Sequence, residues 1–132
     1  MTQTILLIED EPQIVEIYRK AFQRHSPINL LTARTKEEGW RLAMEKRPQI
    51  ILLDLIIPER EGEMVAYDRR VGFDLLRELR HLPETRELPV VVFSNIDTHE
   101  DRTTSEELGV TDYLLKAEFS PAALVQKIQG YL

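Results

Sequence analysis

The chain has 132 residues, 42% of them hydrophobic and 30% charged, a composition typical of one globular domain. Its net charge is −6, which argues against nucleic acid as a main partner because phosphate binding needs a basic surface. There is no cysteine, so disulfides, thiolate metal sites and cysteine nucleophiles are excluded. Apolar runs are too short to span a bilayer, and none follows a basic N-terminal segment. We therefore expect a cytoplasmic protein with no membrane partner.

Short apolar runs alternate along the chain with segments of helical periodicity. Strands are predicted at "TILLI" (4–8), "INLLT" (28–32), "QIILLD" (49–54), "VVVFS" (90–94) and "DYLLK" (112–116). Runs that are apolar along most of their length are typical of strands buried on both faces of a parallel sheet.

A helix is predicted after each strand. The five helices are expected at residues 12–25, from about 35 to 46, at about 72–82, at 99–108, and from 121 onward. Pro12 and Pro121 suit first helical turns, and Thr35 with Glu38 fits a capping box. Right-handed crossovers would place helices on both faces of the sheet. The predicted fold is therefore a doubly wound α/β sandwich.

Polar residues stand where the strands end. Glu9 and Asp10 follow the first strand, Asp54 ends the third, Ser94 the fourth and Lys116 the fifth. The carboxyl ends of parallel strands share one edge of the sheet, where ligands bind in such folds, so these side chains should converge. Each residue alone has a simpler explanation as a helix cap, a turn former or a solvated side chain. The chemical coherence of the whole set favours a site.

Three converging carboxylates repel one another unless they hold a cation, and Mg²⁺ suits such oxygen ligands, with Mn²⁺ as a substitute. Asp54 can then act as a nucleophile toward phosphorus. Lys116 and the Ser94 hydroxyl would stabilise the phosphoryl oxygens. The expected product is an acyl phosphate on Asp54, whose added charge would draw Ser94 and Lys116 inward.

The motifs, taken in order, resemble those of response-regulator receiver domains of two-component signalling. The matching stretches are "LLIEDEP", "IILLDLIIP", "VVVFS" and "LGVTDYLLK". Asp10 precedes Asp54 by 44 residues and Ser94 precedes Lys116 by 22, spacings similar to those of the family. The resemblance covers nearly the whole chain. It implies one receiver domain over residues 1–132, with a flavodoxin-like five-stranded parallel sheet in strand order 2-1-3-4-5.

The resemblance also implies roles for individual residues. Asp54 would be phosphorylated, and Ser94 and Lys116 would contact the phosphoryl group. Tyr113 falls at the family's switch aromatic, unless it only packs or hydrogen-bonds at the sheet edge. Mg²⁺ would be held by three side chains, with Asp10 the main direct ligand, and by one backbone carbonyl: Glu9, Asp10 and Asp54, and the carbonyl of Ile56.

Partners follow from the same resemblance. A histidine kinase or phosphotransfer protein would donate the phosphoryl group, small donors such as acetyl phosphate could replace it, and an unidentified downstream protein would be regulated by docking. Catalysis would be limited to the chain's own phosphoryl transfer and autodephosphorylation. A homodimer would use the face of the fourth helix, fifth strand and fifth helix. The fourth-helix region, "DTHEDRTTSEEL", is strongly polar, so the alternative is that this helix only faces solvent. With no segment left for an output domain, we expect a stand-alone receiver, unless the natural protein continues into an effector.

The chain departs from the family pattern first by an insertion at about 59–71, between the third strand and the third helix. The family's glycine is Gly62 or Gly72, and Gly72 is favoured because "GFDLLREL" then begins the helix. The insertion is either a surface loop or a lid or docking element that changes donor access.

Two single residues also depart from the family. Ala117 replaces the usual proline after Lys116, so either that bond is trans and the loop takes another path, or a cis bond costs about 2.5–4 kcal/mol. Asn95 follows Ser94 in place of a small residue and should slow autophosphorylation or water attack.

Two alternative functions remain open from the sequence. A pseudo-receiver would keep the fold as a binding module that is never phosphorylated. A small phosphatase acting on external substrates would need a second acid two residues after the nucleophile to protonate the leaving group. Ile56 occupies that position and cannot donate a proton, which disfavours the phosphatase.

Overall fold

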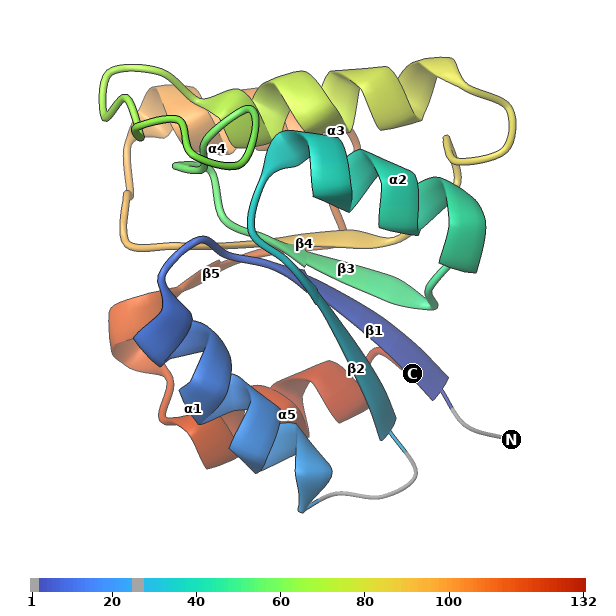
Figure 1. Cartoon of the computed structure of the whole chain (residues 1–132), viewed down its shortest axis with the longest axis vertical. Helices are drawn as coiled ribbons and strands as arrows, with labels where there is room; N and C mark the ends of the chain where they lie inside the picture. Colours follow the sequence, from blue (N-terminus) through green and yellow to red (C-terminus); the bar gives the residue numbers. More distant parts are fainter. Residues whose placement is uncertain (1–2, 25–27) are drawn as a thin grey trace.

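The computed structural model describes residues 3–24 and 28–132, and its five strands form one sheet in the order β2-β1-β3-β4-β5 (Figure 1). Each neighbouring pair runs parallel. The strands are β1 (Gln3–Ile8), β2 (Ile28–Ala33), β3 (Ile50–Leu53), β4 (Val90–Ser94) and β5 (Asp112–Leu115). The predicted fold class and strand order are confirmed.

Helices cover both faces of the sheet. Figure 1 shows α1 and α5 on one face and α2, α3 and α4 on the other. The helices are α1 (Pro12–Gln23), α2 (Lys36–Lys46), α3 (Val71–His81), α4 (His99–Glu107) and α5 (Pro121–Gln129). None of the helices in the described part of the chain is long and apolar enough to cross a membrane.

The element boundaries differ slightly from those predicted. The first helix ends at Gln23, and residue 25, where its end was predicted, lies outside the described residues. Lys116, predicted as the end of the fifth strand, instead begins a 3-10 turn (Lys116–Glu118). The third helix begins at Val71, so residues 59–70, which cover most of the segment predicted to be an insertion, contain no helix or strand, and the structure describes all of them.

Local capping explains where α2 begins. The Thr35 hydroxyl accepts a hydrogen bond from the Glu38 N–H at 3.1 Å. The Glu38 carboxylate in turn accepts one from the Arg34 N–H at 2.9 Å. Such reciprocal bonds satisfy backbone donors that a helix start leaves free. The predicted capping interaction is therefore present, with Arg34 rather than Thr35 as the second donor.

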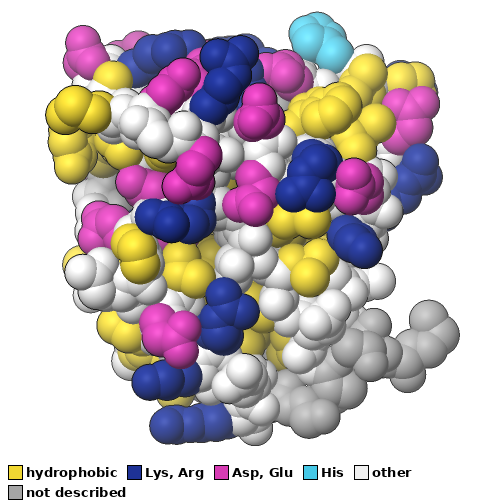
Figure 2. All heavy atoms as spheres, in the orientation of Figure 1, with side chains coloured by type: hydrophobic (Ala, Val, Ile, Leu, Met, Phe, Trp, Pro, Cys, Tyr) yellow, Lys and Arg dark blue, Asp and Glu magenta, His cyan; other side chains and the backbone are white. Residues whose placement is uncertain are grey.

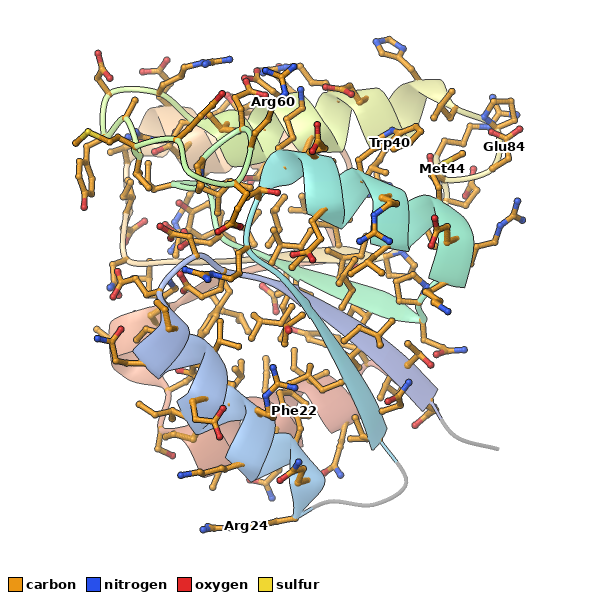
Figure 3. The ribbon with its side chains drawn as sticks, in the orientation of Figure 1. Phe22, Arg24, Trp40, Met44, Arg60 and Glu84 are labelled. Atoms are coloured by element: carbon orange, nitrogen blue, oxygen red, sulfur yellow. The ribbon has the colours of Figure 1, made fainter. Side chains whose placement is uncertain are left out.

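The sheet separates two hydrophobic cores. Because successive side chains of a strand point to opposite faces, Ile5 and Leu7 pack beneath α1 and α5, whereas Leu6 and Ile8 pack beneath α2 and α3. Phe22, fully buried, points from α1 into the first core (Figure 3). Packing on both faces fixes the strand ends, where the polar residues stand.

Candidate functional site

The backbone hydrogen bonds of the sheet place Glu9 and Asp54 side by side. The N–H of Glu9 donates to the carbonyl of Ala33 at 2.9 Å, and the N–H of Asp54 donates to the carbonyl of Ile8 at 3.1 Å. Both residues therefore continue the register of their strands beyond the last ladder position. Glu9 is 1% exposed and Asp54 is 8% exposed. They form the buried floor of the site.

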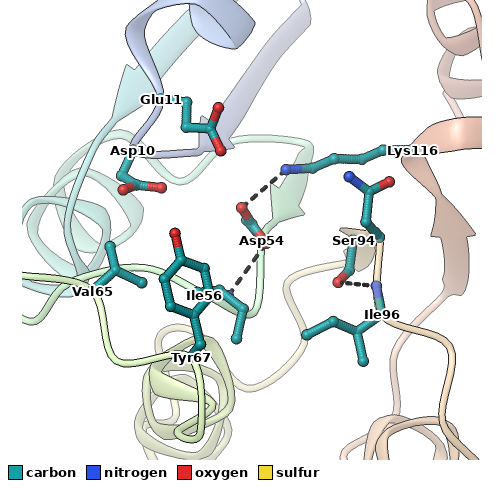
Figure 4. Close-up of a pocket in the computed structure, with 10 residues that line it drawn as sticks. Asp10, Glu11, Asp54, Ile56, Val65, Tyr67, Ser94, Ile96 and Lys116 are labelled. Carbon is teal, nitrogen blue, oxygen red and sulfur yellow. Dashed lines mark hydrogen bonds and ion pairs between the residues drawn. The ribbon is translucent and has the colours of Figure 1, made fainter.

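Lys116 joins these two acids. Its ammonium donates to the Glu9 carboxylate and, at 3.0 Å, to Oδ2 of Asp54. The other carboxylate oxygen of Asp54 accepts a hydrogen bond from the Ile56 N–H at 3.2 Å. Figure 4 shows Asp54 held between Lys116 and Ile56. Although burial opposes it, the charges of Asp54 and Glu9 raise the pKa of Lys116, which keeps it cationic.

Three carboxylates gather around this one ammonium. Ligand oxygens of Glu9, Asp10 and Asp54 lie within 4.8 Å of one another. Burial and the Glu9 charge raise the pKa of Asp54 to about 7, against the opposing effect of Lys116. Burial and Glu9 also raise the pKa of Asp10. The negative charge is thus only partly compensated, and this oxygen-only donor set fits a hard divalent cation such as Mg²⁺.

Ser94 lies at the end of β4, 1% exposed, and contributes to the cavity above Asp54. Its hydroxyl oxygen accepts a hydrogen bond from the Ile96 N–H at 3.0 Å. The next residue, Asn95, is exposed and also lines the cavity. The structure therefore places the Ser94 hydroxyl and the Asn95 side chain in the wall of the cavity that Asp54 also lines.

Tyr113, on β5, is tied to the same loop as Ser94. Its hydroxyl donates a hydrogen bond to the Ile96 carbonyl. The Arg102 guanidinium lies 4.6 Å from the centre of its ring. Burial, reinforced by the charge of Asp101, raises the pKa of Tyr113 to about 12, so the hydroxyl remains a donor. Tyr113 thus packs and hydrogen-bonds at this edge, and it contacts the loop that Ser94 begins.

The absence of proline after Lys116 does not remove Lys116 from the site. Ala117 is exposed within the 3-10 turn that follows β5. The N–H of Phe119 donates to the Lys116 carbonyl at 3.3 Å and closes this turn. The ammonium still reaches Asp54, so the turn accommodates alanine while the Lys116 side chain keeps its position.

Gly72 explains how closely α3 approaches the backbone that follows β3. A Cβ at this position would lie 2.5 Å from the carbonyl oxygen of Asp54 and 2.8 Å from the Cα of Leu55. The Gly72 N–H also donates to the Leu55 carbonyl at 3.1 Å. Gly62, by contrast, has a φ of 86° and a Cβ there would meet no described atom within 4 Å. Gly72 is therefore the glycine that the site requires.

Above the acids lies a cavity of about 470 Å³. The ends of β1, β3, β4 and β5 supply most of its wall, and the 59–70 segment supplies the rest through Val65 and Tyr67. Sequence reasoning placed the insertion beside the site but did not identify these two residues. Without periodicity in the segment, nothing in the sequence indicates which of its side chains turn inward.

Comparison with known proteins bears on the family and the fold of the chain. The family model described as "Response regulator receiver domain" matches residues 5–129. Transcriptional regulatory protein SrrA of Staphylococcus aureus is 29% identical over 132 residues, an alignment that covers 100% of this chain and 48% of SrrA. The chain therefore spans about half the length of the curated relatives it matches.

Solved structures show the same fold. The BeF3-activated receiver domain of RstA from Klebsiella pneumoniae superposes with a TM-score of 0.77 at 22% identity, over 98% of this chain and 97% of that one. Chemotaxis protein CheY4 of Vibrio cholerae superposes with a TM-score of 0.81 at 20% identity, over 100% of both chains.

Proposed function

Because the chain belongs to the response regulator receiver domain family, we propose that it is a phosphorylation-controlled switch. Asp54 accepts a phosphoryl group from a histidine kinase or phosphotransfer protein in the cytoplasm, and the phosphorylated chain regulates another protein by docking. The observation that carries this proposal is the Asp54 carboxylate, held by Lys116 and by the Ile56 N–H at the floor of an open cavity. Its catalysis is confined to its own phosphorylation and dephosphorylation.

The side chains around Asp54 suit phosphoryl transfer. A carboxylate oxygen of Asp54 attacks phosphorus, and the leaving group departs toward the cavity mouth. Lys116 offers its ammonium to the negative oxygens of the phosphoryl group, and Ser94 offers a hydroxyl from the neighbouring strand end. Both groups already line the cavity, so little rearrangement is needed at the moment of transfer.

Glu9, Asp10 and Asp54 would hold Mg²⁺, with Asp10 the main direct ligand and the Ile56 carbonyl as a further one. Bound there, the ion would neutralise charge on the phosphoryl oxygens. The partly compensated carboxylates support this assignment, because an added cation lowers the carboxyl pKa and favours the nucleophilic form of Asp54. Mn²⁺ should substitute, since it accepts the same oxygen ligands.

Ile96 links the phosphoacceptor site to the surface. Its N–H is bonded to Ser94 and its carbonyl to Tyr113. A phosphoryl group on Asp54 would accept a hydrogen bond from the Ser94 hydroxyl and draw that side chain inward. Movement of Ser94 would then shift Ile96 and the contact of Tyr113. The α4–β5–α5 face, which contains Tyr113, is therefore the surface where we place the downstream partner or a second copy of the chain.

Intact-protein mass after incubation with acetyl phosphate and Mg²⁺ tests the proposal. Wild type should gain one phosphoryl group, and the gain should vanish in Asp54→Asn and when the metal is chelated. Asp68→Asn, an exposed aspartate of the inserted segment, is the matched control and should be phosphorylated normally. If wild type gains no mass and also binds no Mg²⁺, the chain is a pseudo-receiver. Turnover of a small phosphoester would instead indicate a phosphatase.

A further inference from the structure

Two residues of the inserted 59–70 segment stand at the mouth of the phosphoacceptor cavity. Val65 is half-buried and Tyr67 is 80% exposed, yet both line the cavity. In the view of Figure 4, the Tyr67 hydroxyl points toward the part of the cavity where Asp10 and Asp54 lie. A ring so exposed does not close the cavity. It forms one side of the entrance, where an incoming molecule would meet it.

Contacts at both ends hold this segment in place. Where it begins, the Lys36 N–H donates to the Pro58 carbonyl at 3.0 Å and the Glu37 N–H donates to the Glu59 carbonyl at 3.0 Å. Where it ends, the Arg70 guanidinium pairs with Asp101 of α4 at 3.1 Å. The entrance residues are therefore carried by a segment that is anchored to α2 and α4.

Ion pairs nearer the solvent hold the same two ends of the segment. Arg69 pairs with Glu59 at 2.6 Å and with Asp74 at 3.1 Å, and Arg60 pairs with Glu37 at 3.4 Å. Arg60 lies above the start of α2 in Figure 3, and Figure 2 shows acidic and basic side chains interspersed over this part of the surface. These pairs bring the two ends of the segment together and leave Val65 and Tyr67 at the cavity.

The geometry of phosphoryl transfer makes this entrance chemically relevant. In an in-line displacement, the attacking and leaving atoms lie on opposite sides of phosphorus. Asp54 lies at the floor, with one oxygen bonded to Ile56 and the other to Lys116. The leaving group would therefore lie toward the mouth, part of which Val65 and Tyr67 line.

We propose that Val65 and Tyr67 are specificity-determining residues that select the phosphodonor by packing against its leaving group. They favour a flat aromatic imidazole, as a phosphohistidine presents, over a leaving group without a ring. In the transfer, the P–N bond breaks as an O–P bond to Asp54 forms, and the imidazole nitrogen keeps the electron pair of the broken bond and ends up protonated from solvent. This inference rests on the proposed phosphorylation of Asp54.

The test compares two small donors that both carry a P–N bond, phosphoimidazole and phosphoramidate, whose leaving groups are imidazole and ammonia. Initial rates of phosphorylation, followed by intact mass in the presence of Mg²⁺, give a preference ratio for each variant. Stacking between aromatic rings changes such a ratio by about two- to tenfold. We expect Tyr67→Ala to lower the preference for phosphoimidazole by that factor and Tyr67→Phe to retain it. Val65→Ala should lower it by less.

Met64→Ala is the matched control. Met64 belongs to the same segment and is 92% exposed, but it lies outside the residues that line the cavity, so the ratio should not change. The inference is overturned if Tyr67→Ala alters both rates by the same factor, because a purely structural role would do that. It is also overturned if Tyr67→Phe behaves like Tyr67→Ala. If wild type accepts a phosphoryl group from neither donor, the proposed function itself fails, and the inference with it.

Discussion

The strand ends and the 59–70 segment both line one cavity, but they are held there by different forces. Asp54 and Ser94 are 8% and 1% exposed and stand at the ends of strands packed on both faces. Met64 and Tyr67, in the segment, are 92% and 80% exposed, and the segment is held mainly by ion pairs and two backbone hydrogen bonds. The core thus fixes the groups proposed to react. Ion pairs, most of them near the solvent, hold the segment that carries the groups proposed to choose the donor.

The largest expected effect lies where the segment meets the core. Gly72→Ala would place a Cβ against the backbone of Asp54 and Leu55, which cannot move without disturbing β3. We expect a loss of about 3 kcal/mol in the free energy of unfolding, measured by urea denaturation, because backbone overpacking has few ways to relax.

Gly62→Ala is the matched control within the segment. Its cost should be about 1 kcal/mol, since only the positive φ opposes a side chain there and space is open. If the two alanine variants prove equally stable, the segment is as tightly constrained as the core, and the distinction between the two regions fails.

The difference between the strand ends and the 59–70 segment explains which residues of the site can be predicted from the sequence. The sequence predicts that the residues at the strand ends lie close together, because parallel topology places all of these ends at one edge of the sheet. These residues are Glu9, Asp54, Ser94 and Lys116. Gly72 could be identified because the helical pattern begins there. Val65 and Tyr67 could not, because the segment has neither alternation nor helical periodicity. Its path depends instead on tertiary contacts between residues distant in sequence.

Arg70 provides the strongest of those contacts, and its loss should have the next largest effect. Arg70 is joined to Asp101, whose side chain is only 8% exposed, so Arg70→Ala would leave a buried carboxylate without its partner. We expect a loss of about 1–3 kcal/mol in the free energy of unfolding.

Arg60→Ala serves as the comparison, because the ion pair of Arg60 with Glu37 is largely exposed on both sides. Exposed pairs contribute little, so the change should be below about 0.5 kcal/mol. Equal losses in the two variants would mean that burial of Asp101 does not decide the strength of the anchor. The donor preference ratio should also fall in Arg70→Ala, because the segment would lose its connection to α4.

The smallest expected effect concerns Asn95. This residue directly follows β4 and lines the cavity on the side away from the 59–70 segment. Asn95 is exposed and lines the cavity, so we expect a shorter side chain there to widen the path of donor and water alike. Asn95→Ala should raise the rates of phosphorylation by acetyl phosphate and of autodephosphorylation by about twofold, which corresponds to ~0.4 kcal/mol in activation free energy. Stability should change by less than about 0.5 kcal/mol, as for other exposed positions.

Because Asn95 is carried by a strand end and not by the 59–70 segment, the effect of Asn95→Ala on the rate should be the same for phosphoimidazole and phosphoramidate. The effect of Tyr67→Ala should differ between these two donors. An effect of Asn95→Ala on the donor ratio as large as that of Tyr67→Ala would show that both sides of the mouth select the donor, and that the 59–70 segment has no special part in it.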